Sequence, residues 1–138
     1  MAYPLHPPVV HFPFALLMTS TAADLAHLAG LWPDPRFAAW LMVLGLAAAL
    51  VAVVAGLYDF RRLTEAQVPV ATRHMGTMAL AATGYAIALY LRRDGLAEPV
   101  SPSTASLALS VASALVLAFG GWLGGELVYR HGAGRIDS

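Results

Sequence analysis

The sequence contains no cysteine, no lysine and few charged residues of either sign. The absence of cysteine excludes disulfides, thiolate metal sites, iron–sulfur clusters and cysteine nucleophiles. Any bound metal must therefore be held by His, Asp, Glu, Met or Tyr. The eight basic residues, all arginine, are balanced by eight acidic ones, so the formal net charge is zero. Because a nucleic-acid-binding protein needs a basic surface, we expect no nucleic-acid partner.

Charge is scarce because apolar residues dominate the chain. Hydrophobic residues make up 59% of the 138 residues and charged residues only 12%. A soluble domain of this size could not cover its exterior with so few polar groups, so the composition predicts an integral membrane protein in contact with the lipid bilayer. Four apolar stretches approach the roughly 20 residues that cross a hydrocarbon core. They are 9–30, 37–58, 74–91 and 105–129.

These stretches predict an all-α fold, a single integral membrane four-helix bundle with both termini on one side, called here the terminal side. The polar segment from Asp59 to Arg73 is expected to be a loop outside the membrane, and a short interfacial helix within it is left open. Five arginines fall on the terminal side and three on the other, and by the positive-inside rule this bias favours cytoplasmic termini. No internal repeat is visible in the sequence.

Histidines gather at the terminal side of the predicted bundle, with two carboxylates at the same depth. The residues are His6, His11, His74, His131, Asp59 and Glu126. Residues three, four, seven and eleven apart share one face of a helix. By that spacing, small residues lie beneath His11, His74 and His131 on their helices. Such faces either pack closely or leave room for a flat cofactor.

Three further residues are candidates through their position beneath these histidines. Gly120 and Gly124 lie on the face of the fourth stretch, and their spacing fits the small-xxx-small pattern of closely packed membrane helices. Close helix association is the first interpretation of this pair, and clearance for a cofactor is the second. Tyr85 lies on the face of His74, deep enough in the bundle to contact a cofactor.

Three chemistries could use the histidines. The first is haem b held between two helices by imidazoles, which suits histidines at matched depth in a chain without cysteine. The second is a transition-metal site completed by Asp59 or Glu126, and the third is a proton or ion pathway. Haem is favoured, because the middle of the predicted bundle lacks a series of ionisable residues. His11 and His74 are the expected axial pair.

The leading hypothesis is thus a small membrane b-type cytochrome that passes electrons to a redox partner protein at the terminal side. His6 and His131 would bind a second haem or form hydrogen bonds to the first. The alternatives are a non-catalytic membrane scaffold or assembly subunit, whose glycine-rich fourth helix packs against partners, and a membrane protein with a His/carboxylate metal site. A homo-oligomer is compatible with each.

Asp24 and His27 lie three residues apart near the opposite side of the membrane. A charged group there is expected to be paired, and the candidates for Asp24 are three arginines at the same depth. They are Arg36, Arg92 and Arg93. Since His27 is the one obvious ligand at that end, no second cofactor is predicted there.

Two segments, 6–13 (HPPVVHFP) and 120–132 (GGWLGGELVYRHG), carry a resemblance that covers nearly the whole chain. The likeness extends to Asp24, to residues 56–59 (GLYD) and to His74. In these residues the chain resembles a bacterial membrane family catalogued as domain of unknown function 2231. The resemblance implies a four-span fold in the inner membrane, in which His6, His11, His74 and His131 match the family's histidine positions. It implies no established activity, although joining to redox modules in such families hints at electron transfer.

Overall fold

The computed structural model describes residues 5–134, which form four long helices and one short 3-10 helix. These elements are α1 (His6–Leu28), α2 (Arg36–Phe60), α3 (Val68–Leu91), η1 (Arg93–Leu96) and α4 (Thr104–Tyr129). No strand occurs within this range. The all-α fold class is therefore confirmed, and each apolar stretch falls on one long helix.

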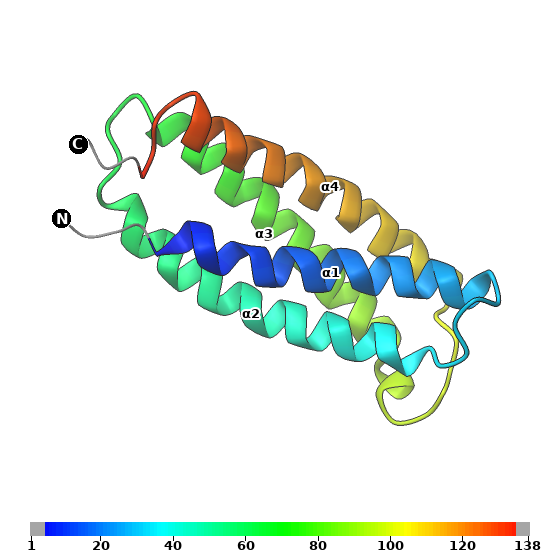
Figure 1. Cartoon of the computed structure of the whole chain (residues 1–138). Helices are drawn as coiled ribbons and strands as arrows, with labels where there is room; N and C mark the ends of the chain where they lie inside the picture. The colour runs from blue at the N-terminus through cyan, green and yellow to red at the C-terminus, as the bar shows by residue number, and fades with distance from the viewer. Residues whose placement is uncertain (1–4, 135–138) are drawn as a thin grey trace.

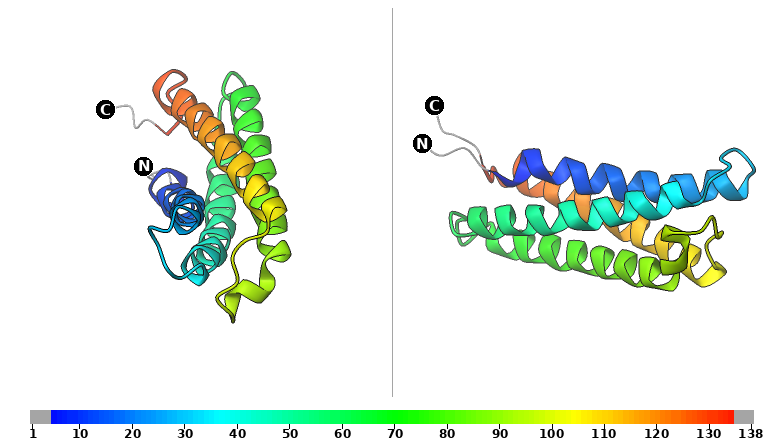
Figure 2. Two further views of the ribbon diagram at one scale, coloured as in Figure 1. Left: turned by 90° about the vertical axis from the view of Figure 1, so that its right-hand side faces the viewer. Right: turned by 90° about the horizontal axis from the view of Figure 1, so that it is seen from below.

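The four long helices run side by side with alternating direction (Figure 1). The start of α1, the α2–α3 loop and the end of α4 lie together at one end, called the terminal end, and η1 lies at the other (Figure 1). Helix α1 packs mainly on α2, and α3 packs mainly on α4, whereas contacts between these pairs are much fewer. The bundle thus consists of hairpin 1 (α1 and α2) and hairpin 2 (α3 and α4), seen from two more sides in Figure 2.

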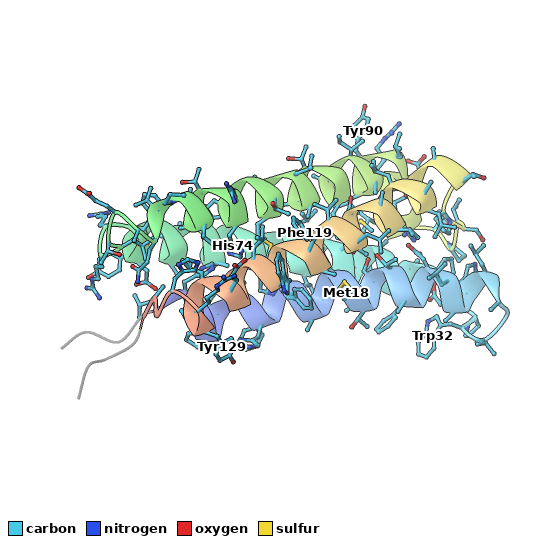
Figure 3. All side chains as sticks on the ribbon, turned by 90° about the horizontal axis from the view of Figure 1, so that it is seen from above. Met18, Trp32, His74, Tyr90, Phe119 and Tyr129 are labelled. Carbon is cyan, nitrogen blue, oxygen red and sulfur yellow. The ribbon has the colours of Figure 1, made fainter. Side chains whose placement is uncertain are left out.

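Helices α1, α2 and α4 are long and apolar enough to cross a membrane. With 23, 25 and 26 residues they exceed the roughly 20 that a bilayer core requires. Helix α3 has 24 residues, but histidine, threonine and tyrosine reduce its apolar character. That α3 also crosses the bilayer stays a prediction. Trp32 and Tyr90 lie toward one end of the bundle and Tyr129 toward the other (Figure 3), where aromatic belts are expected.

The connection between the hairpins is shorter than the loop expected from Asp59 to Arg73, so the bounds of that loop are wrong, while its position outside the membrane stays a prediction. Helix α2 continues through Phe60 and α3 begins at Val68, so only residues 61–67 lie between them. The side chain of Gln67 accepts a hydrogen bond from the backbone N–H of Thr64. A proline then stands in the first turn of α3, where its missing N–H costs little. Polar residues such as Asp59 and Arg73 therefore lie within the helix ends that flank this connection.

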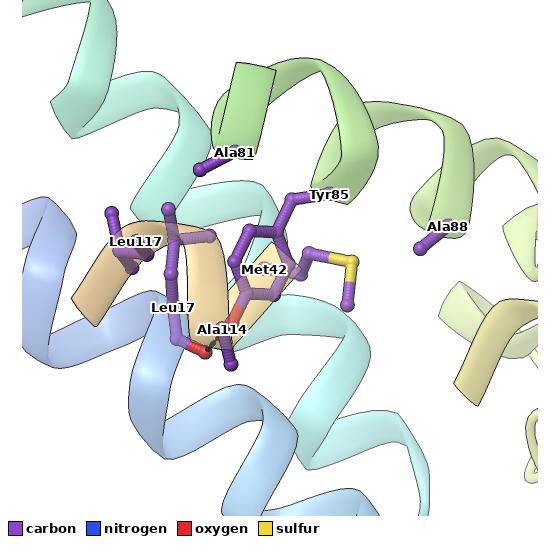
Figure 4. Close-up of a cluster of buried hydrophobic side chains, with 7 residues drawn as sticks. All are labelled: Leu17, Met42, Ala81, Tyr85, Ala88, Ala114 and Leu117. Carbon is purple, nitrogen blue, oxygen red and sulfur yellow. Dashed lines mark hydrogen bonds between the residues drawn. The ribbon is translucent and has the colours of Figure 1, made fainter. Parts of the chain in front are cut away.

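Tyr85 lies at the centre of the core, with none of its surface exposed. It packs among apolar side chains from all four helices, including Leu17 and Met42 (Figure 4). Its hydroxyl donates a 3.0 Å hydrogen bond to the carbonyl of Leu17 and shares a 2.8 Å hydrogen bond with the Thr21 hydroxyl. The expectation that Tyr85 is deep in the bundle is confirmed, and its polar atom is satisfied there.

The two hairpins repeat one another with an offset of 68 residues. Tyr85 and Leu17 differ by 68, and so do Arg92 and Asp24, which are also bonded to each other. Helices α2 and α4 begin at positions separated by the same interval. Buried positions recur in pairs at that offset: Pro13 and Ala81, Ser20 and Ala88, Ala38 and Ser106, Met42 and Ser110, Gly45 and Ser113. Because equivalent residues touch each other, an approximate two-fold axis runs between the hairpins.

Candidate histidine site between the hairpins

His6 of α1 and His74 of α3 bring their imidazole rings together near the terminal end. The ring centres are 6.0 Å apart and the ring planes are nearly perpendicular, at 79°. The two residues come from different hairpins, and their positions are equivalent by the 68-residue offset that relates the hairpins. The rings therefore meet near the approximate two-fold axis, in the half of the bundle where Figure 3 shows His74.

Each ring is anchored in the same way by the other helix of its own hairpin. Nδ1 of His6 is 2.8 Å from the carbonyl oxygen of Ala52, and Nδ1 of His74 is 2.8 Å from that of Gly120. A carbonyl oxygen can only accept, so the proton of each neutral ring is assigned to Nδ1. The lone pair then lies on Nε2. Within residues 5–134 neither Nε2 has a hydrogen-bond partner.

A glycine lies against each ring, again at equivalent positions. A Cβ atom on Gly56 would lie 3.0 Å from Nδ1 of His6, and one on Gly124 would lie 3.0 Å from Cε1 of His74. Both distances are shorter than ordinary van der Waals contacts. A residue larger than glycine at either position would therefore press against the ring. Gly124 thus makes space for His74 itself, while Gly120 supplies the carbonyl that anchors it.

Asp59 fixes the start of α1 and hence the position of His6. One carboxylate oxygen, Oδ2, accepts hydrogen bonds of 2.8 Å from the backbone N–H groups of Leu5 and His6. These are orphan donors at the start of a helix, which a carboxylate satisfies well. Glu126, the other expected carboxylate, pairs with Arg130 at 3.1 Å. The described chain holds no group of three or more His, Cys, Asp and Glu residues that could bind a metal ion.

His11 lies on the exposed face of α1, so the expectation that its face turns inward is wrong. The buried residues of α1 are Pro13, Leu17, Ser20, Thr21 and Asp24. No contact joins the rings of His11 and His74 in the described residues, whereas the inward faces expected for α3 and α4 are confirmed by their buried residues. His131 is half-buried, and its carbonyl accepts a 2.8 Å hydrogen bond from Gln67.

A buried ion pair lies at the opposite end of the bundle. Asp24 pairs with Arg92, one of the three expected arginines, at 2.5 Å, and their side chains are 0% and 2% exposed. The guanidinium also donates to the carbonyl of Pro35. His27 uses both ring nitrogens, toward the carbonyl of Trp32 and the hydroxyl of Ser101. Neither nitrogen of His27 is therefore left to bind a cofactor.

The family described as "Predicted membrane protein (DUF2231)" matches residues 2–137. The chain belongs to this family. The match confirms the resemblance found in the sequence, and it covers both hairpins and all five histidines. As a member, the protein is a membrane protein in contact with the lipid bilayer. No curated protein and no solved structure matches the chain.

Proposed function

We propose that this member of the DUF2231 family is a small b-type haem protein that carries electrons in the membrane. His6 and His74 would hold the haem iron. The observation that carries the proposal is the presence of two neighbouring imidazoles at equivalent positions, each anchored through Nδ1 and each with an unpartnered Nε2.

The anchoring of the rings is the arrangement that metal ligands need. Imidazoles that bind a metal usually donate their other N–H to a carbonyl or carboxylate, which fixes the tautomer and the ring orientation and raises the basicity of the ligand atom. His6 and His74 both do so with a backbone carbonyl. His27 has the contrasting environment, because both of its nitrogens form hydrogen bonds within the protein.

The separation of the rings is also compatible with a shared metal ion. Since metal–imidazole bonds are roughly 2 Å long, two imidazoles whose ring centres lie about 6 Å apart could both bind one iron. The rings of His6 and His74 are separated by 6.0 Å. They meet where the two hairpins join, and contacts between the hairpins are fewer than contacts within each hairpin. Bound there, haem would supply a one-electron carrier whose potential the axial ligands tune.

His6 takes the place of His11 in the axial pair expected from the sequence. The exposed position of His11 turns it away from the junction of the hairpins, whereas His6 shares the inward face of α1 with Asp24. We assign no iron ligand to His131, whose backbone carbonyl holds Gln67.

The proposed location is the inner membrane of a bacterium, with the terminal end in the cytoplasm. At the other end Arg92 is buried with Asp24, and Arg36 is paired with Asp34 at 2.7 Å. Arg61 and Arg73 are exposed toward the terminal end. The arginine bias of the sequence, five on the terminal side against three on the other, supports this orientation. A redox partner protein would dock at the cytoplasmic end, because His6 begins α1 there.

The test is an optical spectrum of the protein purified in mild detergent from haem-replete cells, first oxidised and then reduced with dithionite. We expect a Soret band and visible bands that sharpen on reduction. His6→Ala and His74→Ala should lose most of the haem, while His11→Ala and the control His27→Ala should keep it. A colourless wild-type protein would overturn the proposal. Loss of haem from His11→Ala with full retention in His6→Ala would instead restore the pair expected from the sequence.

A further inference from the structure

The approximate two-fold axis that passes near His6 and His74 passes between Asp24 and Arg92 at the other end of the bundle. Each pair consists of equivalent positions in the two hairpins, separated by 68 residues. At the terminal end the two hairpins present the same residue to each other. At the far end they present opposite charges, both of which are buried.

The opposite charges distinguish two ways in which hairpins could pair: hairpin 1 with hairpin 2, or two copies of the same hairpin with each other. If hairpin 1 paired with hairpin 1 of a second copy, Asp24 would lie against Asp24, and two copies of hairpin 2 would bring Arg92 against Arg92. Burying like charges in contact is strongly unfavourable, above all inside a membrane protein. The histidine pair offers no such distinction, since either pairing brings two imidazoles together.

The surroundings leave the two charges dependent on each other. Oδ1 of Asp24 and Nε of Arg92 are buried without a hydrogen-bond partner in residues 5–134. Apart from the ion pair, the guanidinium has only the carbonyl of Pro35, at 3.2 Å. His27, the nearest ionisable residue on α1, has both nitrogens engaged elsewhere. No other charged side chain within this range forms a salt bridge with Asp24 or Arg92.

We propose that Asp24 and Arg92 select which hairpins pair, so that hairpin 1 pairs with hairpin 2 and the chain closes on itself as one bundle. The partner recognised is therefore the other hairpin of the same chain, and like hairpins of separate copies are rejected by charge. Such selection matters because the two hairpins bury equivalent positions. Without it, a hairpin could pair with either hairpin of another copy of the chain. The inference concerns helix pairing and does not depend on haem.

Complementary charge variants test this selection. Asp24→Arg places two arginines at the far end of its own bundle, and Arg92→Asp places two aspartates there. Expressed alone, each should yield at least tenfold less monodisperse monomer than the wild type. Expressed together with different tags, the two variants should co-purify as a complex of twice the monomer mass. In that complex each introduced charge meets its opposite on the other chain.

Three controls separate charge from damage to the fold. The exchanged double variant Asp24→Arg/Arg92→Asp and the charge-conserving Arg92→Lys should both remain monomeric. Two differently tagged wild-type copies should not co-purify. The proposal is overturned if either single variant gives monomer with the wild-type melting temperature, if the co-expressed single variants do not associate, or if tagged wild-type copies exchange hairpins. Loss of monomer in Arg92→Lys would show that the shape of the guanidinium decides, which also contradicts selection by charge. Light scattering measures the molecular mass of each variant, and tag capture measures whether two chains associate. Neither measurement depends on a cofactor.

Discussion

Replacing Gly124 by alanine tests how closely the protein holds His74. The new Cβ would lie 3.0 Å from Cε1 and 3.3 Å from Nδ1 of the ring. Carbon atoms normally rest roughly 3.5–4.0 Å apart, so the ring must move by several tenths of an ångström. That movement disturbs the 2.8 Å hydrogen bond from Nδ1 to the carbonyl of Gly120. Gly125→Ala is the matched control, because its Cβ would meet nothing closer than 3.9 Å.

The two substitutions should change the free energy of unfolding in opposite directions. Alanine in place of glycine inside a helix is by itself stabilising by roughly 1 kcal/mol, and Gly125→Ala should show that gain. At Gly124 the gain is offset by crowding, which typically costs about 1–3 kcal/mol. The free energies of unfolding of the two variants should therefore differ by about 1–3 kcal/mol. For a chain of this length the difference corresponds to roughly 4–12 °C in melting temperature.

Thermal unfolding of both variants, followed by circular dichroism in one detergent, measures the difference. Gly56→Ala should behave like Gly124→Ala, because its Cβ would lie 3.0 Å from Nδ1 of His6. Haem retention measured on the same samples should fall in both crowded variants and not in Gly125→Ala. Melting temperatures of Gly124→Ala and Gly125→Ala that agree within error would refute the reasoning.

The remaining predictions concern the cap of α1, the core and the topology. Asp59→Ala removes the acceptor of two backbone N–H groups, so denaturation should show a loss of about 1–2 kcal/mol; an unchanged stability would mean that water caps the helix equally well. Tyr85→Phe removes the hydrogen bond to Leu17 and should cost about 1–2 kcal/mol, whereas a neutral effect would argue against a satisfied core hydroxyl. Reporter fusions in loops 61–67 and 97–103 should report opposite compartments, and the same compartment for both would place α3 outside the membrane.

The existence of the helices could be predicted from the sequence better than the residues at which they begin and end. Runs of apolar residues long enough to cross a bilayer have few alternatives to a helix, because lipid cannot satisfy backbone hydrogen bonds. The secondary structure of the segment from Asp59 to Arg73 was harder to predict. Polar residues indicate that a segment is exposed, but they do not indicate that it is not helical. Asp59 stays helical while capping α1, an interaction between distant residues that local composition does not show.

The sequence contains a signal that favours His6 over His11 as the inward-facing histidine, and that signal is the position of Asp24. A charged residue in a membrane helix faces the protein interior. At about 100° per residue, His6 lies on the same side of α1 as Asp24, whereas His11 is turned away by about 140°. Small residues beneath His11 suggested an inward face, but alanine is also common on surfaces that face lipid. The buried charge was the stronger signal for the phase of the helix.

The hairpin repeat leaves few marks in the sequence, because most equivalent positions, apart from the two histidines and the glycines beside them, share a role without sharing chemistry. Ala52 and Gly120 both contribute a backbone carbonyl, which leaves no trace in the side chain. Leu17 and Tyr85 contact each other through a carbonyl and a hydroxyl. Only the geometry of the bundle makes these positions comparable.

The measurement that tests the central claim most directly is the electron paramagnetic resonance spectrum of the oxidised protein. Two imidazoles on one iron predict a low-spin ferric signal in the wild type. His6→Gly and His74→Gly should each convert it to high spin, and added imidazole should restore the low-spin signal by occupying the vacated position. A low-spin signal that survives in both glycine variants without imidazole would contradict His6 and His74 as the axial pair.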